Sequence, residues 1–302
     1  MKAKKRFLSL VLFGGIICIG LTQCAKDGAE GPAGTNGTNG VDASVVSTAD
    51  QTAYNSANGL KGGLAYNEFF IPQTDFPQPA DTLITNHPDF FRCASCHGMD
   101  LLGVNGAAIT NVPAATTPNV SSINLNTYAA AHNIKQIFDA VKHTGGRLRQ
   151  AITYNSLTSL NSNMPDYGLI MGDGMIWNIV KYLKENAVNT DKLYDLTTSG
   201  AYPGGVASFT NIGKDGNAIK GKVYYNANCT TAGCHNSTGS IPTTVETVGS
   251  ILRAEPANAY HLIKFGFPGT AMINLPYQLT AMPDTTLQNL FKAISDTTAF
   301  PN

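Results

Sequence analysis

Residues 93–97 read Cys93-Ala94-Ser95-Cys96-His97, and the interpretation of the whole chain starts from this run. A C-x-x-C-H run is typical of a covalent attachment site for a c-type haem. The thiols of Cys93 and Cys96 can each form a thioether with a porphyrin vinyl group, and His97 then becomes the proximal ligand of the iron. Half of a zinc site and a redox dithiol are the alternatives, but no second half of a zinc site follows nearby.

A second run of the same kind lies in the C-terminal third of the chain, where Cys229 is followed by Cys234 and His235. Its C-x4-C-H spacing is looser, and alone it would suit a haem, a zinc ion or a disulfide. Together with the first run it predicts two c-type haems. Cys229 and Cys234 are then the attachment residues, and His235 is the proximal ligand.

The N-terminus has the features of an export signal. Four basic residues between positions 2 and 6 precede the apolar stretch 7–21, which is short for a membrane span. The segment Leu21-Thr22-Gln23-Cys24 resembles the cleavage site of bacterial lipoproteins, although Gln23 stands where that family has a small residue. The resemblance implies a signal peptide over 1–23, a lipid on Cys24, and an exported protein anchored to a membrane, either periplasmic or on the outer membrane or cell surface. An ordinary cleaved signal beside an unrelated thiol is the alternative.

The cysteine and charge counts agree with this interpretation. Of the six cysteines, Cys18 falls in the signal and Cys24 at its end, so the two haem runs use the other four. Lysine and arginine number 20, as do aspartate and glutamate, and four of the basic residues belong to the signal. The remaining chain therefore carries 16 basic and 20 acidic residues and is mildly acidic, which argues against nucleic acid as a partner.

The 302 residues are enough for two small domains. Residues 24–62 are polar, with glycine at every third position from 28 to 40, and predict a flexible tether that is too short and proline-poor for a collagen helix. A first domain is expected over 63–190 and a second over 216–302, because the linker 191–215 is rich in Gly, Thr, Ser and Pro. Each haem run is followed by an amphipathic helix near the end of its domain, which indicates an internal duplication.

Apolar residues recurring at helical spacing predict the helices of both domains. They fall at 134–143, stopped by Gly145 and Gly146, at 176–183 after an Asp173 cap, at 256–263 before Gly266, and at 287–294 after an Asp284 or Thr285 cap. A further helix from Gly221 leads into the second haem run.

At this point the residues resemble the class I c-type cytochromes. That family has a helix, a C-x-x-C-H run, a short helix, a distal methionine often followed by proline, and a C-terminal helix. The second domain reads GKVYYNANCTTAGCH, NAYHLIKFGFPG and AMPDTTLQNLFKAI, and the first reads FRCASCHGMDLLG, NIKQIFDAVKHTGG, MPDYG and DGMIWNIVKYLKE. The resemblance covers 64–187 and 216–298. It implies a mostly α fold of two tandem cytochrome c-like domains, each a few short helices and long loops around a covalently bound haem. The C-x4-C-H spacing and a longer insert in the first domain depart from the family pattern.

The distal ligand of each iron has several candidates. For the first haem they are Met99, Met164, Met171, Met175, His132 and His143. Met164 is favoured because it ends a long loop and precedes a proline, with His143 next. For the second haem, spacing to the last helix favours Met272, whereas Met282-Pro283-Asp284 repeats Met164-Pro165-Asp166 and favours Met282. Met282 is preferred, then Met272, then His261.

Histidine and methionine together close both faces of an iron and raise its reduction potential. The expected function is therefore that of a membrane-tethered dihaem electron carrier of the bacterial cell envelope, exchanging electrons with redox protein partners rather than acting as an enzyme. A haem enzyme with one open iron, such as a dihaem peroxidase or a haem-dependent dehydrogenase, is the alternative. It would need an acid–base group such as His132, His143 or His261. A structural or assembly lipoprotein is a third class.

Overall fold

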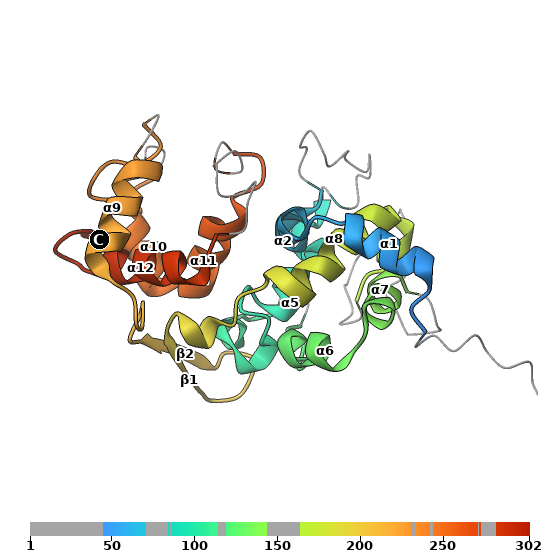
Figure 1. The fold of residues 1–302 in the computed structure, drawn as a ribbon. Helices are drawn as coiled ribbons and strands as arrows, with labels where there is room; N and C mark the ends of the chain where they lie inside the picture. The colour runs from blue at the N-terminus through green and yellow to red at the C-terminus, as the bar shows by residue number, and fades with distance from the viewer. Residues whose placement is uncertain are drawn as a thin grey trace, which may run out of the picture. The chain divides into compact units, whose positions relative to one another are not determined.

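The computed structural model describes residues 45–70, 84, 86–113, 119–143, 164–230, 233–241, 244–270, 272 and 282–302. The expected signal peptide, Cys24 and most of the expected tether lie outside these residues. Residues 42–302 form one compact unit. Helices dominate the described residues (Figure 1), so the prediction of a mostly α fold is confirmed.

The part of the chain before residue 190 contains seven α-helices in the described residues: α1 (Thr48–Ser56), α2 (Gly59–Glu68), α4 (Pro88–Phe91), α5 (Cys93–His97), α6 (Leu125–Ala131), α7 (Ile134–Lys142) and α8 (Asp173–Lys181). Short 3-10 turns lie between them at η1 (Gly103–Asn105), η2 (Ala107–Thr110) and η3 (Tyr167–Leu169). A π-helical turn, η4 (Tyr182–Asn186), extends α8, and the 3-10 turn η5 (Thr190–Lys192) follows it.

The part after residue 190 begins with an antiparallel hairpin of β1 (Asp195–Ser199) and β2 (Val206–Thr210), in which Leu196 pairs with Phe209. This hairpin occupies the segment predicted as a linker. Four α-helices follow: α9 (Ala218–Asn228), α10 (Val248–Ala254), α11 (Pro256–Phe265) and α12 (Asp284–Ile294). The predicted helices at 134–143, 256–263 and 287–294 are thus confirmed as α7, α11 and α12.

Local sequence explains where these helices begin and end. The side chains of Asn133 and Gln136 form a capping box at the start of α7, and His143 ends the helix in the left-handed conformation with φ 65°. Gly145 and Gly146, the predicted stop, lie outside the described residues. Gly266 closes α11 as predicted. The stripe Ile134, Ile137, Phe138 and Val141 is buried.

Both predicted aspartate caps are wrong. Gly172 is the residue before α8 and Pro283 the residue before α12, so Asp173 and Asp284 are the first helical residues, and Thr285 lies inside α12. Their carboxylates pair with lysines of other elements instead of capping amides. A negative charge in the first turn still favours each helix, because it opposes the partial positive charge of the N-terminus.

The predicted tether extends too far along the chain. Helices α1 and α2 occupy residues 48–68, within and just beyond the segment 24–62 that was predicted to be flexible. Ser47 and Asp50 form a capping box that starts α1, and Tyr54 and Leu60 are buried. A few anchoring residues among polar ones are enough to fold this stretch, and composition alone did not reveal them.

The same helix crossing occurs twice. Helix α2 packs against α8, and α9 packs against α12. In each pair a glycine permits the close approach, because a Cβ on Gly62 would lie 1.9 Å from the carbonyl oxygen of Asn178, and one on Gly221 would lie 1.9 Å from that of Asn289. Elements far apart in the sequence therefore repeat the same packing, as expected from a duplicated unit.

The two repeats share part of one hydrophobic core. Helix α11 packs against α2, and the Tyr260 hydroxyl donates a 2.8 Å hydrogen bond to the carbonyl oxygen of Met99. A Cβ on Gly63 would lie 2.3 Å from the ring of Phe265, so glycine is required at this contact too. The haem run of the first repeat is thereby joined to a helix of the second.

Candidate functional site

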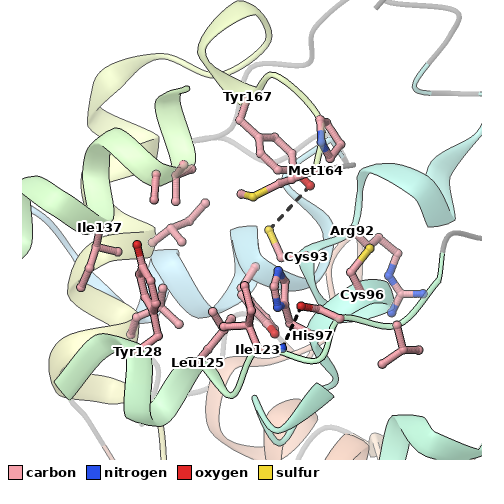
Figure 2. A pocket seen from close by; sticks show the side chains of 18 of the residues that line it. Arg92, Cys93, Cys96, His97, Ile123, Leu125, Tyr128, Ile137, Met164 and Tyr167 are labelled. Carbon is pink, nitrogen blue, oxygen red and sulfur yellow. Dashed lines mark hydrogen bonds between the residues drawn. The ribbon is translucent and has the colours of Figure 1, made fainter. Parts of the chain in front are cut away.

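A cavity of about 420 Å³ opens beside α5, and the side chains of the first C-x-x-C-H run form one side of it (Figure 2). Cys93, Cys96 and His97 all line it, as does Met164, the favoured distal residue. The other lining residues are mainly apolar or aromatic and include Tyr66, Val120, Ile123, Leu125, Tyr128, Ile137, Val141, Tyr167, Ile179 and Leu183. The structure thus brings the four predicted residues of the first site together.

Helix α5 is little more than one turn long, which places the two thiols and the imidazole on one face. Burial raises the pKa of Cys93 to about 11 and that of Cys96 to about 12. Both cysteines are free and therefore held as thiols at neutral pH. The hydroxyl of Tyr167 lies 3.9 Å from the sulfur of Cys93 and donates a 3.0 Å hydrogen bond to the carbonyl oxygen of Phe91.

His97 is held as a neutral imidazole. Burial lowers its pKa to about 4, although the nearby backbone of Ile123 opposes part of this effect. Its Nδ1 is buried and makes no well-formed hydrogen bond to any described residue. Gly98 ends the helix at φ 73°, and the Tyr66 hydroxyl donates a 2.7 Å hydrogen bond to its carbonyl oxygen. A neutral, buried imidazole that lines a cavity is suited to bind a metal ion.

The other candidates for the distal ligand lie elsewhere. Met99 faces a different cavity, and neither Met171 nor Met175 lines the first one. His132 stacks on Tyr128, and its Nδ1 lies 2.8 Å from the carbonyl oxygen of that residue. His143 is also absent from the cavity wall, because its Nδ1 pairs with a carboxylate oxygen of Asp166 at 2.7 Å. In the view of Figure 2 the side chains of Met164 and Tyr167 lie beside Cys93, which is drawn between them and His97.

A second cavity, of about 100 Å³, lies in the second repeat. Cys229, Cys234 and His235 line it together with Met272 and Met282, so both methionine candidates reach this cavity. The remaining lining residues are mainly apolar and come from α9, α10, α11, α12 and the loop before α10: Tyr224, Tyr225, Ile241, Val248, Ile251, Leu252, Ala259, Leu262, Ile263, Leu290 and Ile294.

The second haem run reaches its cavity by a different backbone path. Cys229 is the C-cap residue of α9, and Gly233, with φ 73°, lets the chain turn before Cys234 and His235. Burial raises the pKa of Cys229 to about 12 and lowers that of His235. As in the first site, Nδ1 of the histidine is buried with no hydrogen-bond partner among the described residues.

His261, the third candidate for the second iron, does not line the second cavity. Ala259, Leu262 and Ile263 present one face of α11 to that cavity, whereas the His261 ring packs 4.8 Å from Phe265 and 6.4 Å from Tyr66. This leaves the two methionines as the distal candidates in the described part of the wall.

The residues of the first cavity fit a c-type haem. Two thiols, a neutral imidazole and a thioether line an apolar space whose volume lies within the range of about 300–1,000 Å³ typical of cofactor sites. The second cavity has the same donors but falls below that range, so its walls would have to move apart around a haem. In both, burial lowers the pKa of the histidine and favours the neutral imidazole, which is the form that binds a metal ion.

Tyr167 was not anticipated in the first site, whereas the aromatic cluster at 64–70, which contains Tyr66, was expected to cover the first haem. Tyr167 follows Met164 by three residues and touches Cys93, and Tyr66 supports the turn after His97. The only sequence signal for them was the aromatic cluster at 64–70 and the MPDYG motif.

No protein-family model, curated protein or solved structure matches the chain. Among the helices that the structure describes, none is long and apolar enough to cross a membrane. Within the same residues, no three His, Cys, Asp or Glu side chains gather closely enough to hold a metal ion by themselves.

Proposed function

We propose that the chain is a dihaem c-type cytochrome with two tandem domains of the class I type, and that it carries electrons in the bacterial cell envelope. Cys93 and Cys96 would hold one haem and Cys229 and Cys234 the other. A lipid on Cys24 would tether the protein to a membrane, where it would meet its redox protein partners.

The observation that carries this proposal is the repetition of one arrangement. In each repeat a helix with a crossing glycine, a Cys/Cys/His run, a short helix, a Met-Pro-Asp segment and a final helix surround an apolar cavity. Two unrelated metal or disulfide sites would not require the same helix crossing and the same Met-Pro-Asp segment. A duplicated haem-binding unit would account for both.

When bound, a haem supplies an iron that gains and loses one electron. The protein would contribute the rest. His97 and His235 offer neutral imidazoles on one side of each cavity, and Met164 and Met282 offer thioethers, which favour the reduced iron. The apolar walls exclude water. An iron held by a ligand on each side has no open position for a substrate, which suits electron transfer rather than substrate turnover.

The packing between the repeats also supports electron transfer. Tyr66 lines the first cavity and its ring lies 6.4 Å from that of His261. His261 belongs to α11, and the opposite face of that helix lines the second cavity. Buried side chains and helix α11 thus lie between the two cavities, which supports an exchange of electrons between them.

The three histidines named as acid–base groups for the enzyme alternative do not line the cavities. His132 and His143 do not line the first cavity, and His261 does not line the second. Among the described lining residues, no histidine other than the two proximal ones reaches either cavity.

The mass of the mature protein tests haem content directly. We expect two covalent haems, and Cys229→Ala should weaken or abolish attachment of the second. One haem in the native protein, or full retention of two in the variant, would contradict the proposal.

Spectra of methionine variants test the axial ligands. Met164→Ala should open the first iron and Met282→Ala the second, each with a fall in potential, more high-spin character and binding of added cyanide. Met272→Ala should do none of this. If Met272→Ala opens the second iron and Met282→Ala does not, the assignment of Met282 is wrong.

A further inference from the structure

Each favoured distal methionine is followed two residues later by an aspartate whose carboxylate is engaged by a base. In the first repeat, Oδ2 of Asp166 lies 2.7 Å from Nδ1 of His143. His143 is the C-cap residue of α7, the helix that contributes Ile137 and Val141 to the cavity wall. The segment after Met164 is thus fastened to the helix that lines its own cavity.

Close backbone packing supports this fastening. A Cβ on Gly168 would lie 2.3 Å from the carbonyl oxygen of Lys142, so the turn after Met164 rests directly on the end of α7. Both partners of the His143–Asp166 pair are largely shielded, at 22% and 23% side-chain exposure. Such shielding reduces screening by water and salt and strengthens the interaction relative to one on the surface.

The second repeat has the same construction with a different base. Oδ1 of Asp284 lies 3.5 Å from Nζ of Lys264, in the last turn of α11, and the other carboxylate oxygen lies 3.1 Å from Nζ of Lys192. Lys264 is only 4% exposed. Burial lowers its pKa, and the charge of Asp284 opposes that effect. Helix α11 contributes Leu262 and Ile263 to the second cavity, as α7 does to the first.

The sequence around Met272 differs from that around Met164 and Met282. The residues after it are Ile273 and Asn274 rather than proline and aspartate. Its own backbone N–H donates to the Thr270 hydroxyl at 3.2 Å, a contact within a local turn. The Met-Pro-Asp sequence therefore sets Met282 apart from Met272, although both line the second cavity.

We propose that Asp166 with His143, and Asp284 with Lys264, are positioning pairs that hold the two distal methionines at their cavities. The proposal rests on the proposed function, in which Met164 and Met282 are iron ligands. A ligand must be held within a fraction of an ångström of its productive position. Proline fixes one backbone dihedral after the methionine, and the paired carboxylate fixes the segment to the cavity wall.

Four substitutions in the full-length, haem-loaded protein test the pairs. Asp166→Asn and His143→Leu break the first pair. Lys264→Met breaks the second and leaves Asp284 with Lys192, which avoids the unpaired buried lysine that Asp284→Asn would create. His143→Lys keeps a base in the first pair and makes it resemble the second.

A matched control removes an ion pair between similar elements without touching the segment after the methionine. Lys142 of α7 and Asp173 of α8 form such a pair, at 2.6 Å, and Asp173 is 58% exposed. Asp173→Asn should change neither iron, because exposed ion pairs contribute little.

Three measurements separate positioning from general stability: the weak far-red sulfur-to-iron absorption of the oxidised protein, the rate of cyanide binding, and hydrogen exchange of the amides at 166–170 and 284–288. Breaking a pair should remove one iron's share of the band and speed cyanide binding at that iron about tenfold, the equivalent of one charge-assisted hydrogen bond. Exchange should rise only in the affected segment. His143→Lys, unlike His143→Leu, should keep the band at its native intensity.

The outcomes distinguish a failure of methionine ligation from a failure of the positioning role. If the native protein shows no far-red band, methionine ligation is wrong and the positioning role falls with it. If the native band is present but Asp166→Asn, His143→Leu and Lys264→Met leave it and the cyanide rate unchanged, the positioning role is overturned while the proposed function stands.

Discussion

Replacing His261 with phenylalanine should make the protein less sensitive to acid. His261 is fully buried, and neither ring nitrogen has a hydrogen-bond partner among the described residues. Burial lowers its pKa from an ordinary 6.5 to about 3. When pH falls below 6.5, the unfolded chain takes up a proton at this residue and the folded protein does not, so stability is progressively lost down to the folded pKa.

The size of the effect follows from that difference. A pH of about 5 lies roughly 1.5 units below the pKa of the unfolded histidine. Protonation then stabilises the unfolded state, and the protein loses about 2 kcal/mol of stability. At about pH 8 both states are neutral and the contribution vanishes. A phenylalanine ring in the same place cannot titrate. When the pH is lowered from about 8 to about 5, the variant should therefore lose about 2 kcal/mol less stability than the native protein. Any packing difference with Tyr66 and Phe265 is the same at both pH values.

Denaturant unfolding of the full-length protein, followed by far-ultraviolet circular dichroism, measures this difference. The useful quantity is the stability of the variant minus that of the native protein at each pH, because packing differences cancel when the two pH values are compared. Tyr260→Phe is the matched control. It removes the hydroxyl that bonds the Met99 carbonyl, and burial raises the pKa of Tyr260 well above the range tested, so its loss of about 1 kcal/mol should be the same at both pH values.

The reasoning would be refuted if the difference between His261→Phe and the native protein were the same at both pH values. In that case the ring either binds a proton in the folded state or is less buried than the structure indicates.

Two further predictions concern the helix crossing and the membrane tether. Gly62→Ala should destabilise the protein by about 3 kcal/mol, because its Cβ would meet the Asn178 carbonyl at 1.9 Å, whereas Gly174→Ala, in the open on α8, should be neutral or slightly stabilising in the same denaturant titration. Cys24→Ala should release the protein from membranes to the soluble fraction, and unchanged partitioning into detergent would count against a lipid anchor.

Features set by short stretches of sequence were predictable. The periodic helices α7, α11 and α12 form where apolar spacing placed them, because the burial of a helical stripe depends on neighbours three and four residues away. The convergence of Cys93, Cys96 and His97 also follows from their spacing on one turn.

Features set by distant contacts were not predictable. Asp173 and Asp284 carry the residue type of an N-cap, but Lys142 and Lys264 engage their carboxylates from other helices. Residues 48–62 looked like tether because only a few apolar side chains anchor them to the rest of the molecule. The choice between Met282 and Met272 remains a prediction, since both line the cavity.

The sequence of α11 also did not predict that His261 would be buried against Tyr66 and Phe265. The neutrality of this ring matters for the proposed function. A protonated ring here would put a positive charge between the two cavities and would favour the reduced state of both irons. Burial keeps the ring neutral at every pH well above its lowered pKa of about 3. In the proposed function, His261 therefore adds no change of charge between the two sites when the pH varies around neutrality.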